Sequence, residues 1–176
     1  MVDSKTNAST SFGPVELLTH GEDETTAVGR LLSGALVGGE RIGLSGELGA
    51  GKTCLVRGLA EGLGIAPEKV RSPSFTLVIP YEGGRVPLYH IDLFRMYPGE
   101  IDRLALREYL YGDGVCAIEW FEHLGEPLDD FLEISLTFVE EEKRRLLAVG
   151  HGVRYEPLLN VLRERRHQEP TWRAGK

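Results

Sequence analysis

Residues 46–53, GELGAGKT, constrain this chain more than any other stretch of it. They match the pattern G-x-x-x-x-G-K-[ST], in which backbone N–H groups of a glycine-rich turn form a nest for phosphate. Glycines at 46, 49 and 51 permit the backbone angles that such a turn needs. The helix that follows adds the positive end of its dipole. The octapeptide therefore predicts a strand–loop–helix unit that binds a nucleoside triphosphate.

The flanking residues predict the same order. Residues 41–45, RIGLS, form a short β-prone run that leads directly into the glycine-rich loop. Residues 52–62 carry apolar side chains at helical spacing, namely Leu55, Val56, Leu59 and Ala60. Gly62 and Gly64 are helix stop signals. Strand, loop and helix thus follow one another as a phosphate loop requires.

Helices and strands alternate along the rest of the chain. Apolar spacing predicts further helices over residues 22–36, 99–110 and 155–165. Strands are predicted over residues 75–81, 86–93, 115–118, 132–139 and 145–149, the last two as a hairpin. This alternation predicts an α/β fold: a three-layer P-loop NTPase fold with a largely parallel sheet and antiparallel strands at its C-terminal edge. We expect one domain over residues 14–166, with flexible tails at 1–13 and 167–176.

Composition limits the kinds of partner that we expect for this chain. A chain of 176 residues suits one domain with a buried core. Its net charge of −7 argues against holding nucleic acid by bulk electrostatics, which needs a basic surface. The N-terminus lacks the apolar region of a secretory signal, and no apolar run reaches bilayer length. Cys54 and Cys116 give neither a disulfide framework nor metal-ligand spacing. We therefore expect a cytoplasmic protein with no membrane partner.

Two acidic residues are candidates for the Mg²⁺ site that a phosphate loop needs. Asp92 and Glu119 each end an apolar strand, where an unpaired carboxylate is costly. Their spacing does not rank one above the other as the metal ligand. His90 lies two residues before Asp92, on the same face of the predicted strand, so a small polar cluster is expected there.

Three further features have two interpretations each. Residues 71–76, RSPSFT, are either a switch segment whose hydroxyls sense the γ-phosphate and Mg²⁺, or an ordinary Ser-Pro turn. Cys54 begins a helix, but no basic residue is placed to activate it, so packing is favoured over a nucleophilic role. The basic run Arg163, Arg165 and Arg166 is read as a solvated helix face rather than an RNA-binding surface.

Four segments together resemble one family, the bacterial TsaE (YjeE) ATPases. They are GELGAGKT, then VRSPSFTL at residues 70–77, YHIDLFR at 89–95 and IEWFE at 118–122. Their order and spacing agree with the family over roughly residues 22–123. Small departures are Ser74 where Thr is common, Phe75 and Phe94 where Tyr is common, and Phe121 where Pro is common. The last of these puts the shape of the loop after Glu119 in question.

The resemblance implies an ATP-binding and ATP-hydrolysing accessory protein for N6-threonylcarbamoyladenosine modification of tRNA. Such a protein is a Mg²⁺-dependent ATPase, slow alone and stimulated by its partners TsaB and TsaD. Hydrolysis sustains repeated turnover of the transferase TsaD, and tRNA is met only indirectly, through the complex. An acidic protein with no basic face suits that indirect role.

The resemblance also assigns residues. The nucleotide is expected to be bound by Thr25 at the base side, by Trp120, and by the loop residues Gly49, Ala50, Gly51, Lys52, Thr53 and Cys54. Thr53 and Glu119 are the implied Mg²⁺ ligands. Lys52 and Asp92 are the implied catalytic residues, with Asp92 organising the metal's water or the attacking water. Ser74 and Thr76 fall in the family's switch-like segment.

Two other functions are weighed against this one. A small-molecule kinase has similar length and the same loop, but usually closes an arginine-bearing lid over the transferred phosphate. The sequence shows no Gly/Arg-rich lid segment after the third strand. A GTPase-like binding switch would carry the guanine-reading string N-K-x-D, which does not occur.

Overall fold

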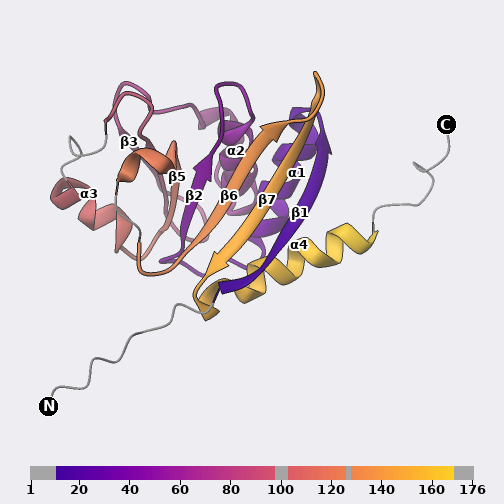
Figure 1. Cartoon of the computed structure of the whole chain (residues 1–176). Coiled ribbons are helices and arrows are strands. Elements are labelled where there is room, and N and C mark those ends of the chain that lie inside the picture. The colour runs from indigo at the N-terminus through magenta and orange to yellow at the C-terminus, as the bar shows by residue number, and fades with distance from the viewer. Residues whose placement is uncertain (1–10, 98–102, 126–127, 169–176) are drawn as a thin grey trace, which may run out of the picture.

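The computed structural model describes residues 11–97, 103–125 and 128–168. Within these ranges seven strands form one sheet in the order β1-β7-β6-β2-β5-β4-β3 (Figure 1). The strands are β1 Ser11–His20, β2 Arg41–Ser45, β3 Val78–Tyr81, β4 Leu88–Asp92, β5 Val115–Glu119, β6 Phe131–Phe138 and β7 Lys143–His151. The helices are α1 Glu22–Ser33, α2 Lys52–Gly62, α3 Arg103–Leu110 and α4 Glu156–Gln168. Short 3₁₀ turns are η1 Pro67–Lys69, η2 Phe121–Leu124 and η3 Val153–Tyr155.

The sheet is parallel at its centre and antiparallel at both edges. Strands β6, β2, β5 and β4 run parallel, in that order. The predicted hairpin β6–β7 is present but does not form the edge of the sheet, because β1 pairs antiparallel with β7 outside it. At the other edge, β3 pairs antiparallel with β4. The α/β, P-loop-type fold is therefore confirmed, with a mixed sheet whose parallel part surrounds β2.

The outermost strand was not expected. Residues 11–13 belong to β1 rather than to a flexible tail, because Ser11–His20 pairs along the whole length of β7. The buried side chains Val15, Leu17 and Thr19 alternate along this strand with exposed ones. At the other end, α4 reaches Gln168, so residues 167 and 168 are helical. Residues 99–102 of the predicted helix lie outside the described part of the chain, and α3 begins at Arg103.

Two apolar cores lie between the sheet and the helices, one on each face of the sheet. Along β5, Val115 and Ala117 pack into the core that also contains residues of α1, α2 and α4. Cys116 and Ile118 point the other way, into the core that contains residues of α3 and η2. Strand residues alternate between faces, so a continuous apolar run such as β5 must be covered on both sides. None of the described helices is long and apolar enough to cross a membrane.

The topology brings three strand ends together. Because β2, β4 and β5 are parallel, their carboxyl ends meet at one edge of the sheet. Asp92 and Glu119 are direct register partners there. The glycine-rich loop leaves β2 at the same edge and turns into α2. Ligand sites of open α/β sheets lie at this kind of edge.

Candidate functional site

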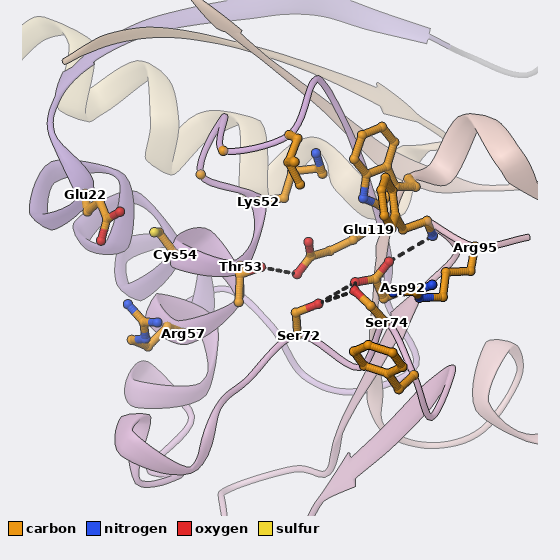
Figure 2. A pocket seen from close by; sticks show the side chains of 16 residues that line it. Glu22, Lys52, Thr53, Cys54, Arg57, Ser72, Ser74, Asp92, Arg95 and Glu119 are labelled. Atoms are coloured by element: carbon orange, nitrogen blue, oxygen red, sulfur yellow. Dashed lines mark hydrogen bonds between the residues drawn. The ribbon is translucent and has the colours of Figure 1, made fainter. Parts of the chain in front are cut away.

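A pocket of ≈ 430 Å³ opens where these strand ends meet α2 (Figure 2). Its walls come from the glycine-rich loop, the first turns of α2, the segment around Ser72 and Ser74, and the ends of β4 and β5. Figure 2 shows Glu22, Cys54 and Arg57 at one end of the pocket. Ser74, Asp92 and Arg95 lie at the other end. Most of the residues expected to bind nucleotide and metal are therefore gathered in one place.

The glycine-rich loop has the backbone geometry that its sequence predicts. Gly46, Gly49 and Gly51 have φ angles of 133°, 80° and 105°, a region that L side chains rarely adopt. A Cβ at Gly46 would also collide with the Leu136 carbonyl of β6. Helix α2 begins at Lys52, directly after the loop. The predicted strand–loop–helix unit is present, and its helix N-terminus faces the pocket.

The Lys52 ammonium is held inside the loop. Its Nζ donates to the carbonyl oxygens of Gly46 and, at 2.9 Å, Glu47. It also lies 3.9 Å from the ring centroid of Trp120, a cation–π contact. Burial lowers the pKa of Lys52, while the negative charges of Glu119, Glu122, Asp92 and Glu47 act to raise it. The end of the Lys52 side chain thus lies between the backbone of the glycine-rich loop and the Trp120 ring.

Glu119 connects the loop helix to the sheet. Its carboxylate is 3% exposed, and Oε1 accepts a 2.8 Å hydrogen bond from the Thr53 hydroxyl. His90 Nε2 lies 2.8 Å from the same oxygen. A hydroxyl and a carboxylate beside a phosphate nest are the hard oxygen donors that Mg²⁺ takes in phosphate-binding enzymes. Thr53 and Glu119 therefore fit Mg²⁺ by their donor chemistry.

Asp92 is tied to the segment that follows η1. Its Oδ2 accepts hydrogen bonds from the hydroxyls of Ser72 and Ser74, each at 2.6 Å. Its Oδ1 accepts from the Phe94 backbone N–H at 2.9 Å. Asp92 lines the pocket, and within the described part of the chain no hydrogen bond joins it to Glu119. The Asp92 carboxylate thus accepts hydrogen bonds from two hydroxyls and is not part of the Thr53–Glu119 pair.

The Ser-Pro segment forms a turn beside the pocket, and its role as a switch stays a prediction. A turn is present, since the N–H groups of Thr76 and Leu77 donate to the Pro73 carbonyl. Yet Ser72 and Ser74 also line the pocket. Thr76 is exposed and does not line it, so Ser72 takes the place expected of Thr76.

Thr25 is not in the pocket wall. Its side chain is fully buried, and its hydroxyl contacts Thr19 Oγ1 at 2.9 Å and the Gly21 carbonyl at 3.1 Å. Its methyl group lies behind Gly51. Thr25 joins β1 to α1 and supports the loop from behind, outside the pocket wall, and the base-side contact that the resemblance implied stays a prediction.

The loop after Glu119 has a defined shape. Trp120 takes a left-handed conformation, with φ 57° and ψ 45°, and its ring packs on Phe94 with centroids 5.0 Å apart. Phe121, at the position of departure from the family pattern, begins η2. Its ring covers Gly43 of β2 and contacts Phe131 with centroids 4.8 Å apart. Phe121 is therefore a packing residue beneath the sheet, and Trp120 stays at the pocket.

Cys54 is enclosed at the opposite end of the pocket. The thiol residue is 7% exposed, and burial is the largest cause that raises its pKa. The negative charge of Glu22 raises that pKa further, while Arg57 acts to lower it. A thiol with a raised pKa is a poor nucleophile near neutral pH. This agrees with packing as the interpretation of Cys54.

Two arginines at the site were given no nucleotide-binding role from sequence. Arg95 lines the pocket, with its guanidinium carbon 4.3 Å from the centroid of the Phe75 ring. Arg144 of β7 lies against Gly51, is 8% exposed, and has no hydrogen-bond partner for Nε among the described residues. Arg95 stood in the YHIDLFR segment as a visible signal. Arg144 gave none, because only the β6–β7 hairpin brings it to the loop.

Comparison with known proteins gives one consistent family. The family model described as Threonylcarbamoyl adenosine biosynthesis protein TsaE matches residues 19–146. A Bacillus subtilis (strain 168) protein named tRNA threonylcarbamoyladenosine biosynthesis protein TsaE is 40% identical over 141 residues, covering 80% of this chain and 88% of that protein. The protein of the same name from Nostoc sp. (strain PCC 7120) is 42% identical over 128 residues, covering 70% and 78%.

A solved structure agrees in shape. The crystal structure of Bacillus subtilis YdiB superposes with a TM-score of 0.74 at 34% sequence identity, covering 88% of this chain and 97% of that one. The match extends well beyond the glycine-rich loop, through the strands that carry Asp92 and Glu119. This chain belongs to the TsaE family.

Proposed function

We propose that this chain binds and hydrolyses Mg²⁺–ATP in the pocket, and that hydrolysis serves tRNA threonylcarbamoyladenosine biosynthesis together with TsaB and TsaD. The observation that carries the proposal is the Thr53–Glu119 hydrogen bond of 2.8 Å beside a phosphate nest. Relatives bearing the name of that biosynthesis support the pathway. The partners, and a location in the cytoplasm, follow from the resemblance of the sequence motifs.

Each residue has a physical role in this proposal. Loop N–H groups and the Lys52 ammonium neutralise the β- and γ-phosphates. Thr53 and Glu119 supply oxygen ligands for Mg²⁺, which when bound neutralises charge on the same phosphates. Asp92 accepts a hydrogen bond from the attacking water and so orients it toward phosphorus. The oxygen of the water bonds to the γ-phosphorus as the bond from that phosphorus to the β–γ bridging oxygen breaks. One water proton stays on the phosphate and the other passes to solvent, which gives ADP and inorganic phosphate.

The partner assignment agrees with the charge of the chain. With a net charge of −7, direct and strong binding of tRNA by bulk electrostatics is disfavoured. Contact with tRNA through TsaB and TsaD needs no basic surface on this chain. The small-molecule kinase alternative would need an acceptor site next to the γ-phosphate, and the relatives named for tRNA modification favour the ATPase.

The proposal is tested by phosphate release from ATP, with and without TsaB and TsaD. We expect slow hydrolysis by the chain alone and a clear stimulation by the pair. Lys52→Ala should abolish both rates, whereas the exposed Lys69 of η1 gives a matched control in Lys69→Ala. Transfer of phosphate from ATP to a small-molecule acceptor, with no stimulation by the pair, would overturn the proposal in favour of a kinase.

A further inference from the structure

His90 is a fully buried histidine in the middle of β4. Its side chain is 0% exposed, and it lies on the same face of the strand as Asp92. Tyr81 of the neighbouring β3 packs near its ring, with centroids 6.4 Å apart. Within the described residues, its only polar contact is with Glu119, at 2.8 Å from Nε2 to Oε1. Among the described residues, the polar contact of this deeply buried histidine is therefore with a proposed metal ligand.

The chemistry of the pair fixes which atom donates. An ionised carboxylate is an acceptor only, so Nε2 of His90 must carry the hydrogen. Nδ1 has no partner among the described residues and is fully buried. A hydrogen on Nδ1 would leave a buried donor unsatisfied, so the hydrogen is assigned to Nε2. His90 therefore offers Glu119 one directed hydrogen bond.

The two hydrogen bonds on Glu119 leave its other oxygen available. Oε1 accepts from His90 on the strand side and from Thr53 on the helix side. Oε2 has no hydrogen-bond partner among the described residues. A glutamate has three side-chain torsions, and two bonds to one oxygen restrict them strongly. The carboxylate is thus presented to the pocket in one orientation, with Oε2 unpaired.

We propose that His90 is a positioning residue that holds Glu119 for the divalent cation. This inference rests on the proposed function, because it assumes that Glu119 and Thr53 take part in binding Mg²⁺–nucleotide. His90 itself contacts neither nucleotide nor metal in this proposal. Its hydrogen bond keeps the carboxylate from rotating away from Thr53, in the manner of the hydrogen-bond partners that orient metal-binding carboxylates. Loss of such a partner typically lowers metal affinity by about 10- to 100-fold.

A matched pair of substitutions separates this role from simple packing. Glutamine in His90→Gln can place an amide N–H near the position of Nε2 and so donate to Glu119. Methionine in His90→Met has similar length and volume but carries no donor. Both replace the imidazole ring, so a packing role predicts similar losses in the two variants. A positioning role predicts that only the methionine variant is impaired.

The measurement is the affinity of the full-length chain for a fluorescent ATP analogue, mant-ATP, with Mg²⁺ and with EDTA. We expect His90→Gln to keep the wild-type gain in affinity that Mg²⁺ gives, and His90→Met to lose about 10- to 100-fold of it. Both should keep the wild-type affinity in EDTA. Binding of Mn²⁺ to the nucleotide complex, followed by electron paramagnetic resonance, should weaken in His90→Met alone.

Equal Mg²⁺ dependence in wild type and both variants would overturn the role of His90, as would equal losses in both variants. If His90→Met does not fold, His90→Asn replaces it, because the shorter amide cannot reach Glu119. Combining His90→Met with Glu119→Gln should cost no more than Glu119→Gln alone, since the two residues act through one bond. Failure of the part of the proposed function on which this inference rests, Mg²⁺–nucleotide binding, is distinguishable, because wild-type protein would then show no Mg²⁺-dependent binding at all.

Discussion

The Thr53 hydroxyl donates a 2.8 Å hydrogen bond to Oε1 of Glu119, which joins the first turn of α2 to the end of β5. These residues are 66 positions apart in the chain and meet because β2 and β5 are parallel neighbours. The pairing holds the two proposed Mg²⁺ ligands next to the phosphate nest. A metal arriving with a nucleotide would therefore find its protein oxygens already in place, which lowers the cost of ordering them on binding.

Removing the Thr53 hydroxyl should weaken the Mg²⁺-dependent binding of ATP. We expect Thr53→Ala to weaken binding of ATP in the presence of Mg²⁺ by about 10-fold or more, with little change in EDTA. Thr53→Ser keeps the hydroxyl and is the matched control, expected to stay near wild type. Isothermal titration calorimetry measures both. An alanine variant with the wild-type response to Mg²⁺ would remove Thr53 from the metal site.

Asp92 should matter more for hydrolysis than for binding. Asp92→Asn keeps the size of the side chain but removes the negative charge, and we expect hydrolysis to fall about 10²- to 10⁴-fold. The affinity for ATP should change only a few-fold, because the phosphate nest is intact. Single-turnover hydrolysis and equilibrium binding separate the two effects. Comparable losses in both measurements would argue against a role in orienting water.

The fluorescence of Trp120 should change when the Lys52 ammonium moves from the Trp120 ring to a bound phosphate. The ammonium of Lys52 lies 3.9 Å from the Trp120 ring centroid, and a bound phosphate would compete for the same positive charge. With Trp172→Phe as background, leaving Trp120 as the one tryptophan, addition of ATP should change its fluorescence. The change should be absent in Lys52→Ala. Unchanged emission, with binding verified by calorimetry, would contradict this contact.

The two cysteines should differ in reactivity. Cys54 lines the pocket, whereas Cys116 lies in the core and burial raises its pKa to about 12. Since burial also raises the pKa of Cys54, its thiolate fraction is small at pH 7, and its alkylation rate should increase with pH. Bound ATP should slow that alkylation, and Cys116 should react only on unfolding. Mass spectrometry of alkylated protein checks this, and faster labelling of Cys116 than Cys54 would contradict the assignment.

The close contact between α1 and α2 should be sensitive to a single methyl group. A Cβ at Gly58 would meet the Thr26 carbonyl of α1. Overpacking of this kind typically costs about 1–3 kcal/mol in the free energy of unfolding, so Gly58→Ala should be destabilised by that amount. Gly13→Ala has open space for its methyl group and serves as the control. Urea denaturation measures both, and equal stabilities would contradict the packing.

Much of the site could be predicted because its signals are local. The glycine-rich loop, the helix after it and the acids that end two apolar strands all lie in short continuous segments. The parallel pairing of β4 and β5 then places Asp92 and Glu119 side by side at one edge of the sheet. β1 was missed because Gly13 and Pro14 break its early part, leaving the short alternation of Val15, Leu17 and Thr19 without an evident partner strand.

Features set by long-range packing could not be predicted. Arg144 reaches the loop only because β7 folds back beside β6, and nothing in its neighbours marks it. Thr25 was expected at the nucleotide, but its hydroxyl is occupied by Thr19 of β1, the strand that was not foreseen. The strand that was not predicted is therefore also the reason that Thr25 packs against β1, outside the pocket wall.

The most direct test of the account is threonylcarbamoyladenosine formed on tRNA over many turnovers by TsaB, TsaD and this chain with Mg²⁺ and ATP. Wild-type protein should sustain formation well beyond one product per TsaD, whereas Asp92→Asn should stop after about one, because the proposed function assigns the repeated turnover of TsaD to hydrolysis. Sustained formation at the wild-type rate with Asp92→Asn, in a reaction that fails when the chain is omitted, would contradict the claim that this pocket hydrolyses ATP for the modification.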